Sequence, residues 1–213
     1  MRTWWLRNRW ALLALPLVLA LTWAATSYRV LTMWNPFQLT DEVTAPAGEP
    51  VHLVQELSDA KGTFVVDVEL TASPARQVSA LTHPDHSTSF FPGEAGTVVW
   101  QVDLTVTADP GTVVTACLVR LVDTRGRETT YSSVAPGVEV PFAPCVPEET
   151  PGPLPALSPD EVPASDEPER PGTYTVPVVF RTADDFVPDR MDIWYEAPRY
   201  ASLPVRPDLD GQE

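Results

Sequence analysis

The feature that most constrains this chain is a long uncharged run near its beginning. The run, WALLALPLVLALTWAATSY at 10–28, holds 19 residues without a charged side chain. As a helix it would span about 28 Å, close to the hydrocarbon thickness of a bilayer. Arg2, Arg7 and Arg9 precede it, and short basic flanks are retained in the cytoplasm. We therefore expect a transmembrane anchor at 10–28, a basic cytoplasmic tail at 1–9 and an extracytoplasmic remainder.

A cleaved signal peptide is the alternative interpretation of the same segment. A basic start, an apolar stretch and the small residues Thr22, Ala24 and Ala25 also fit that pattern. The run is longer than the apolar part of most signal peptides, which favours an anchor. Cleavage would instead give a secreted ligand-binding domain. Aromatic rings, which prefer the bilayer surface, lie near both ends of the run and also favour an anchor: Trp4, Trp5, Trp10, Trp23, Tyr28 and Trp34.

Charge is divided unevenly along the chain. The 213 residues include 14 basic and 29 acidic side chains. The first acidic residue is Asp41, so the part from residue 30 onward holds 10 basic and 29 acidic residues, a formal charge of −19. A surface of this sign repels phosphate backbones, which argues against DNA or RNA as a partner.

Alternation of apolar and polar residues predicts β-strands beyond residue 50. Residues 64–70 (FVVDVEL) and 98–106 (VVWQVDLTV) place their apolar side chains on one face, as strands covered on one side require. The stretch 112–123 (TVVTACLVRLVD) is apolar on both faces, which is typical of a central strand. With the turn residues after it, this stretch predicts a hairpin at 112–134. Weaker strands are predicted at 51–57, 75–82, 138–142, 173–180 and 191–197.

The segment 146–172 interrupts this pattern. It holds 8 prolines and 7 acidic residues among 27 positions, too little apolar material to pack, and predicts a disordered acidic excursion. Strand-like residues resume after it, so we expect one β-domain formed by 50–145 and 173–200. Residues 29–49 are expected to form a juxtamembrane stalk, and 201–213 a C-terminal tail.

The spacing of the short strands indicates the fold class. Strands separated by Gly and Pro, with no helical period outside the apolar run, predict an all-β protein with a single antiparallel immunoglobulin-like β-sandwich after one transmembrane helix. The segment LVDTRGRETTY at 121–131 follows the predicted strand that carries Cys117. It resembles the strand-turn-strand passage of small secreted or membrane-anchored bacterial immunoglobulin-like domains. The resemblance supports the fold and implies no activity, because such domains share none.

Two cysteines, Cys117 and Cys145, are the candidates for a covalent crosslink. In an oxidising compartment outside the membrane, an even number of cysteines predicts a disulfide. Closing that loop would contribute about 3.5 kcal/mol on the chain-entropy model. Two reduced, buried thiols are one alternative, and a redox pair, which commonly has Cys-x-x-Cys spacing, is another.

The motifs of the common enzyme classes are missing. His83, Asp85 and His86 offer metal ligands only in principle, because a loop does not fix the His-x-x-His spacing. There is no Gly-x-Ser-x-Gly elbow and no phosphate-binding glycine motif. We therefore expect solvated loop histidines, no cofactor, no bound metal and no enzymatic activity, although carboxylates that pair only in space stay open. A further acidic group lacks the spacing of a calcium loop and is expected to be a solvated turn: Asp184, Asp185, Asp189 and Asp192.

Phe90 and Phe91 are the candidate contact residues. They lie in a predicted loop from Thr82 to Thr97, where exposed aromatic rings would suit a partner. Rings that fold back to cap one end of the sandwich are the alternative. We expect a non-catalytic extracytoplasmic interaction module, an accessory or scaffold component whose partner is an envelope or integral-membrane protein. The rival hypotheses are a secreted or surface ligand- or metal-binding protein and a cell-surface hydrolase.

Overall fold

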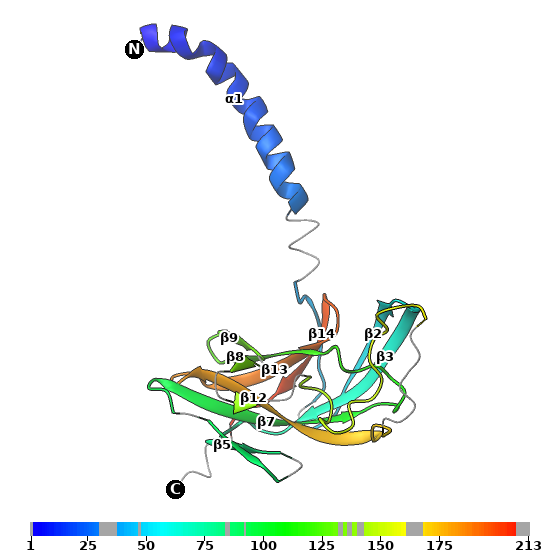
Figure 1. Cartoon of the computed structure of the whole chain (residues 1–213). Helices are drawn as coiled ribbons and strands as arrows, with labels where there is room; N and C mark the ends of the chain where they lie inside the picture. Colours follow the sequence, from blue (N-terminus) through cyan, green and yellow to red (C-terminus); the bar gives the residue numbers. More distant parts are fainter. Residues whose placement is uncertain are drawn as a thin grey trace. The chain divides into compact units, whose positions relative to one another are not determined.

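Two compact units make up the chain, Met1–Leu39 and Thr40–Glu213. The first contains an apolar helix, and the second is built mostly from antiparallel sheets (Figure 1). The structure is a computed structural model, and the residues that it describes are 2–29, 38–46, 48–83, 86–91, 93–131, 134–135, 138–139, 143–160 and 168–207.

Helix α1 (Arg2–Arg29) belongs to the first unit and accommodates Pro16 in its interior. A polar side chain in the apolar part is satisfied by the helix itself, since Thr22 Oγ1 donates to the carbonyl of Val18 at 2.8 Å. The stretch Arg7–Ser27 has a mean hydropathy of 1.7 and is not buried against the rest of the described chain. The stretch is long and apolar enough to be a candidate membrane span. A signal sequence near the N-terminus would meet the same criteria of length and composition.

The first sheet of the second unit has the strand order β12-β7-β3-β2, and the short β4 also pairs with β7. These pairs are antiparallel. The longest ladder joins β12 to β7 and runs from the pair Thr173 with Thr107 to the pair Ala183 with Thr97. The strands are β2 (Val51–Asp59), β3 (Gly62–Ala72), β4 (Arg76–Gln77), β7 (Thr97–Thr107) and β12 (Thr173–Ala183).

The second sheet has the strand order β1-β14-β13-β8-β9. Its pairs are antiparallel except for β1, which runs parallel to β14. Two short ribbons, β5 with β6 and β10 with β11, lie outside both sheets. The strands of this sheet are β1 (Asp41–Val43), β8 (Leu118–Asp123), β9 (Glu128–Thr130), β13 (Pro188–Trp194) and β14 (Arg199–Pro204), and the ribbons are β5 (Ala80–Thr82), β6 (Thr88–Phe90), β10 (Val134–Ala135) and β11 (Val138–Glu139).

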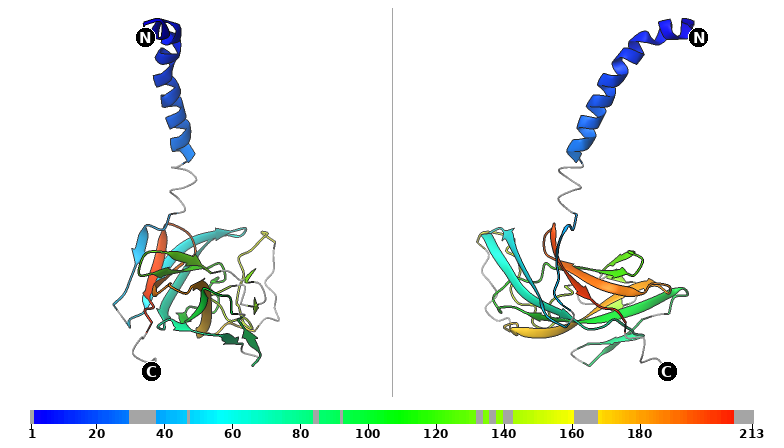
Figure 2. Two further views of the ribbon diagram at one scale, coloured as in Figure 1. Left: turned by 90° about the vertical axis from the view of Figure 1, so that its left-hand side faces the viewer. Right: turned by 180° about the vertical axis from the view of Figure 1, so that it is seen from behind.

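Side chains from both sheets form one hydrophobic core. In β2, buried and exposed residues alternate, because successive side chains of a strand point to opposite faces. Figure 2 shows the two sheets from two further directions. β3 follows the same rule over most of its length, whereas β8, β13 and β14 bury residues on both faces. The buried apolar residues of the core include Val66, Val68, Leu70, Trp100, Val102, Leu104, Val119, Leu121, Val176, Val178, Met191, Ile193, Ala201 and Leu203.

A carboxylate closes the turn between β8 and β9. Asp123 Oδ1 accepts the backbone N–H groups of Arg125 and Arg127, and Asp123 Oδ2 accepts Arg127 Nε at 2.7 Å. Arg127 Nη1 also donates to Asp185 Oδ1, at 2.7 Å, in the turn that follows β12. Asp185 of the predicted solvated acidic turn therefore binds arginine, which ties the two turns together. The prediction is wrong for Asp189 and Asp192, which lie in β13, where Asp192 is fully buried.

The predicted central strand at 112–123 is wrong in its first half. The strand β8 begins at Leu118, and residues 112–117 form turns and loop. Val114 is nevertheless fully buried in the core. A buried loop and a buried strand can have the same apolar composition, so periodicity alone does not separate them.

Two predicted boundaries are also wrong. The predicted stalk at 29–49 contains β1, which pairs with β14, and residues 30–37 lie outside the described residues. The predicted tail at 201–213 begins inside β14, where Ala201 and Leu203 are buried in the core. Both strands are short, and Pro198 precedes the second while Pro204 ends it, so neither gives a long alternating pattern.

Candidate functional site

The predicted contact residues lie at the end of the β5–β6 ribbon. Phe90 pairs with Ala80, and its side chain is 73% exposed, whereas Leu81 on the opposite face is buried. Phe91 is half-buried, and its N–H donates to the carbonyl of Ser79 at 2.9 Å. The predicted loop from residue 82 to residue 97 therefore contains strand β6. The ribbon presents one ring to solvent and packs the other.

Of the two loop histidines expected to be solvated, one is exposed and the other is largely buried. The side chain of His83 is 11% exposed, so the prediction of a solvated loop histidine is wrong for it. Its Nε2 lies 2.9 Å from Ser89 Oγ, and its Nδ1 lies 3.6 Å from Glu148 Oε2. His86 is exposed, and Asp85 lies outside the described residues. Among the residues that the structure describes, no three metal-ligating side chains come together.

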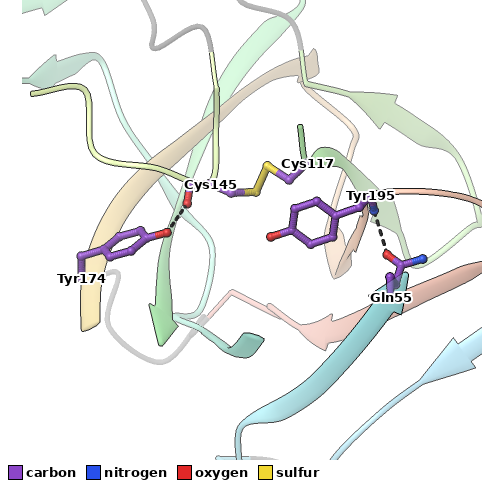
Figure 3. The surroundings of a disulfide bond; sticks show 5 residues. All are labelled: Gln55, Cys117, Cys145, Tyr174 and Tyr195. Atoms are coloured by element: carbon purple, nitrogen blue, oxygen red, sulfur yellow. Dashed lines mark hydrogen bonds between the residues drawn. A yellow bond between two sulfur atoms is a disulfide. The ribbon is translucent and has the colours of Figure 1, made fainter. Parts of the chain in front are cut away.

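The two cysteines are joined in the structure. Cys117 and Cys145 form a disulfide with Cα atoms 6.2 Å apart, and both residues are buried. The hydroxyl of Tyr174 donates to the carbonyl of Cys145 at 2.8 Å, and Tyr195 N–H donates to Gln55 Oε1 at 2.9 Å. Figure 3 shows the hydroxyl ends of the two tyrosines turned toward one another beside the disulfide.

Burial controls the chemistry of these tyrosines. Burial raises the pKa of Tyr174 to about 12, although the nearby guanidinium of Arg170 opposes the shift. Burial also raises the pKa of Tyr195, and the neighbouring Tyr174 adds to that shift. Both phenols therefore stay protonated near neutral pH, and the hydroxyl of Tyr174 remains a donor to the Cys145 carbonyl.

A buried arginine orders the segment that precedes β12. Arg170 is 1% exposed, and it donates from Nη1 to the carbonyl of Thr112 at 2.9 Å and from Nη2 to the carbonyl of Asp109 at 2.6 Å. Gly152, at φ 77°, lies against it, and a Cβ at this position would come within 3.1 Å of Arg170 Nη1. The guanidinium carbon of Arg170 lies 5.7 Å from the ring centroid of Tyr174.

A second contact fixes the middle of the same segment. The N–H of Ala156 donates to Asp59 Oδ2 at 2.9 Å, and the Ala156 carbonyl accepts the N–H of Ala60 at 3.1 Å. The prediction of a disordered excursion at 146–172 is therefore wrong for 146–160 and 168–172, while 161–167 lie outside the described residues. The polar contacts of Ala156 and Arg170, together with the buried side chain of Val146, attach this proline-rich chain to the β-unit.

An apolar cavity lies between this segment and the disulfide. Its volume is about 530 Å³. The hydroxyl oxygen of Thr115 in its wall is buried and has no hydrogen-bond partner among the residues that the structure describes. Glu148 is the charged group among the described lining residues, which are Thr115, Ala116, Ala143, Val146, Pro147, Glu148, Pro151, Leu154 and Pro155.

A charged cluster on the second sheet is satisfied internally. Arg120 Nε donates to Asp192 Oδ2 at 2.8 Å, and Arg120 Nη1 donates to Glu128 Oε2 at 2.8 Å. Its guanidinium carbon lies 5.9 Å from the ring centroids of both Trp194 and Tyr200. The buried carboxylate and the arginine neutralise one another, so removal of either partner would leave an uncompensated charge in the sheet.

No protein family, curated protein or solved structure matches this chain. The geometry itself must therefore indicate the site. The cavity was missed at the sequence level because six of its lining residues fall within 146–172, where composition predicts disorder. One signal was present: Cys145 directly precedes the proline-rich stretch, and a cysteine in a disulfide fixes the chain on both sides of it.

Proposed function

We propose that this protein is a non-catalytic extracytoplasmic interaction module, held at the membrane by α1 and binding an envelope or integral-membrane partner. The observation that carries the proposal is the combination of an unburied apolar helix with a disulfide-closed β-unit in one chain. An apolar surface along the whole helix requires an apolar environment, and a bilayer supplies one. Disulfides persist in oxidising compartments, which supports an external position for the β-unit.

Orientation is proposed from charge. Arg2, Arg7 and Arg9 precede the apolar stretch, and the acidic side chains all follow it. Basic flanks remain in the cytoplasm, so the N-terminus is inside and the β-unit outside. A secreted form, produced by cleavage of the same segment, is the alternative.

An immunoglobulin-like β-sandwich is the fold that we propose for the β-unit. In such domains the B strand lies between A and E, and the C strand lies between F and C′, with G next to F. The order β3-β7-β12 and the order β9-β8-β13-β14 agree with these neighbours. The disulfide departs from the usual connection between strands B and F, since Cys117 precedes β8 and Cys145 lies between β9 and β12.

The contact surface that we propose is the exposed ring of Phe90. A large aromatic side chain at a ribbon end, free of the core, has the exposure that partner-binding anchors show before binding. Phe91 supports the ribbon from its half-buried position. The contact between His83 Nε2 and Ser89 Oγ, 2.9 Å apart, joins the residue after β5 to β6 and holds the ribbon that presents Phe90.

Membrane attachment is tested by fractionation and a topology reporter. The full chain, with a reporter fused after Glu213 that is active only outside, is expected in the membrane fraction with the reporter active. A soluble external product with a new N-terminus near Thr26 would replace the anchor with the signal-peptide interpretation. An inactive reporter would contradict the orientation.

Partner binding is tested by two matched substitutions. Phe90→Asp removes the proposed anchor, and Val65→Asp places the same charge on another exposed apolar position, 54% exposed, on β3. An aromatic anchor commonly carries about 2 kcal/mol or more, so Phe90→Asp should weaken partner recovery about thirtyfold in crosslinking from membranes. Val65→Asp should leave recovery unchanged, and both variants should keep the wild-type melting temperature. Equal recovery by both variants would remove Phe90 from the interface.

A further inference from the structure

The apolar cavity has walls that are fixed before any ligand arrives. Thr115 and Ala116 directly precede Cys117, while Ala143, Val146 and Pro147 flank Cys145, so the disulfide joins two walls covalently. The third wall comes from Pro151, Leu154 and Pro155. The contacts of Ala156 with Asp59 and Ala60 hold this wall in place.

The lining combines an apolar body with one charged group. Apolar side chains and proline rings supply most of the surface. The hydroxyl oxygen of Thr115 has no partner in the described part of the chain, but it is buried and out of reach of a molecule in the cavity. The carboxylate of Glu148 is half exposed, and its described ion-pair partner, His83, lies at 3.6 Å, longer than a strong hydrogen bond.

Size and charge indicate the occupant. A volume of about 530 Å³ is in the range of sites that enclose drug-sized molecules, and a mostly apolar lining with a few placed polar groups is typical of them. A carboxylate favours a cation, and the strongly acidic chain beyond residue 30 adds to that preference. An anionic molecule of the same shape would meet repulsion at Glu148.

We propose that this cavity binds a small organic cation with an apolar body, such as an arylalkyl amine. The apolar body fills the space between the disulfide and the proline-rich wall. The ammonium group donates to the carboxylate of Glu148. The site is separate from the Phe90 surface and does not depend on the proposed partner.

Three probes with one apolar body and different head groups test the proposal: 4-phenylbutylamine, 4-phenylbutanol and 4-phenylbutyrate. Their binding is measured by isothermal titration calorimetry on the full chain in nanodiscs of neutral phosphatidylcholine. The amine should bind about two- to fivefold more tightly than the alcohol, the range expected for a half-exposed ion pair. The carboxylate should bind more weakly than the alcohol. Equal affinity for the three, or a preference for the carboxylate, overturns the proposal.

Variants of the lining separate the site from the lipid and from the rest of the surface. Ala116 is an exposed residue of the lining, so the larger side chain in Ala116→Trp should fill the cavity. This variant should reduce the binding of all three probes to the level of empty nanodiscs. Glu148→Gln should abolish the preference for the amine, whereas Glu149→Gln, at an exposed position outside the lining, should keep it. Unchanged binding in Ala116→Trp, or the same behaviour of the two glutamine variants, overturns the proposal.

A folding control keeps these results interpretable. Each variant should retain the disulfide in non-reduced mass spectrometry and unfold at the wild-type temperature. If Ala116→Trp unfolds early, Leu154→Trp replaces it, because Leu154 lines the cavity from the proline-rich wall and is 63% exposed. This variant should weaken the binding of all three probes. Wild-type affinity for all three in Leu154→Trp overturns the proposal.

Discussion

Removal of the disulfide is the perturbation whose cost the structure defines best. The change is Cys117→Ala with Cys145→Ala, since both positions are buried and a serine hydroxyl would lack a partner there. The bond closes a loop with a sequence separation of 28, which corresponds to about 3.5 kcal/mol of unfolding free energy on the chain-entropy model. The missing sulfur atoms should add about 1 kcal/mol through lost packing.

Urea unfolding of a chain that begins at residue 38 measures this loss, with fluorescence of Trp100 and Trp194 as the signal. A destabilisation of this size should lower the midpoint by about 2 M urea. Wild-type protein under reducing conditions keeps its sulfur atoms and should lose the loop contribution alone. Tyr174→Phe is the matched control, because it removes the hydrogen bond to the Cys145 carbonyl, about 1 kcal/mol, and keeps the disulfide.

A loss below about 1.5 kcal/mol in the double alanine variant would refute the reasoning. It would mean that packing alone holds the two walls of the cavity, or that the unfolded chain is already compact around these residues. The double variant should also bind 4-phenylbutylamine more weakly than the wild type, since its walls are no longer joined. Unchanged binding together with a large loss of stability would show that the cavity does not depend on the disulfide.

Two further predictions concern the other contacts of the proline-rich segment. The pKa of Asp59 is lowered, first by the N–H of Ala156 and then by that of Lys61, so this contact is present above the ordinary carboxyl pKa of 3.8 and is lost as the pH falls through the lowered value. Asp59→Ala at pH 6 should speed hydrogen exchange at Ala156, and exchange at the wild-type rate would contradict this. Arg170→Met leaves two backbone carbonyls without their charged donor and should cost about 3 kcal/mol in the urea assay, whereas the exposed Glu169→Gln should cost almost nothing.

Strict alternation located the central strands of the first sheet from sequence. Residues 98–106 lie within β7, and 64–70 lie within β3, because each strand turns one face to the core. The opposite face is mostly exposed in β3, whereas in β7 it is half-buried and Gln101 is buried. The alternation in the sequence and the alternation of burial in the structure have the same cause, because successive side chains of a strand point to opposite faces. Short strands escape this reasoning: β1 has three residues, and no period can be read from three. β14 was missed because its residues on both faces are largely buried, so alternation does not appear.

The exposure of the candidate contact residues was predicted in part. Phe90 is exposed, as expected for an apolar ring outside an alternating run, and its role in binding stays a prediction. The different environment of Phe91 depends on the ribbon register, which local sequence does not give. His83 was misjudged because its neighbour Glu148 is distant in sequence and comes close only through the fold.

The proline-rich segment shows why composition failed at the cavity. Composition counts apolar residues and predicts disorder when too few are present to offset the entropy of ordering the chain. Here the ordering comes from a covalent bond at Cys145, a carboxylate at Asp59 and a buried guanidinium at Arg170, none of which an apolar count includes. Between these attachments the prolines themselves reduce the entropy to be lost, since their φ angles are already fixed. A chain held in this way can keep apolar groups such as Leu154 facing an unfilled space, and that combination turns a disordered composition into one wall of a binding cavity.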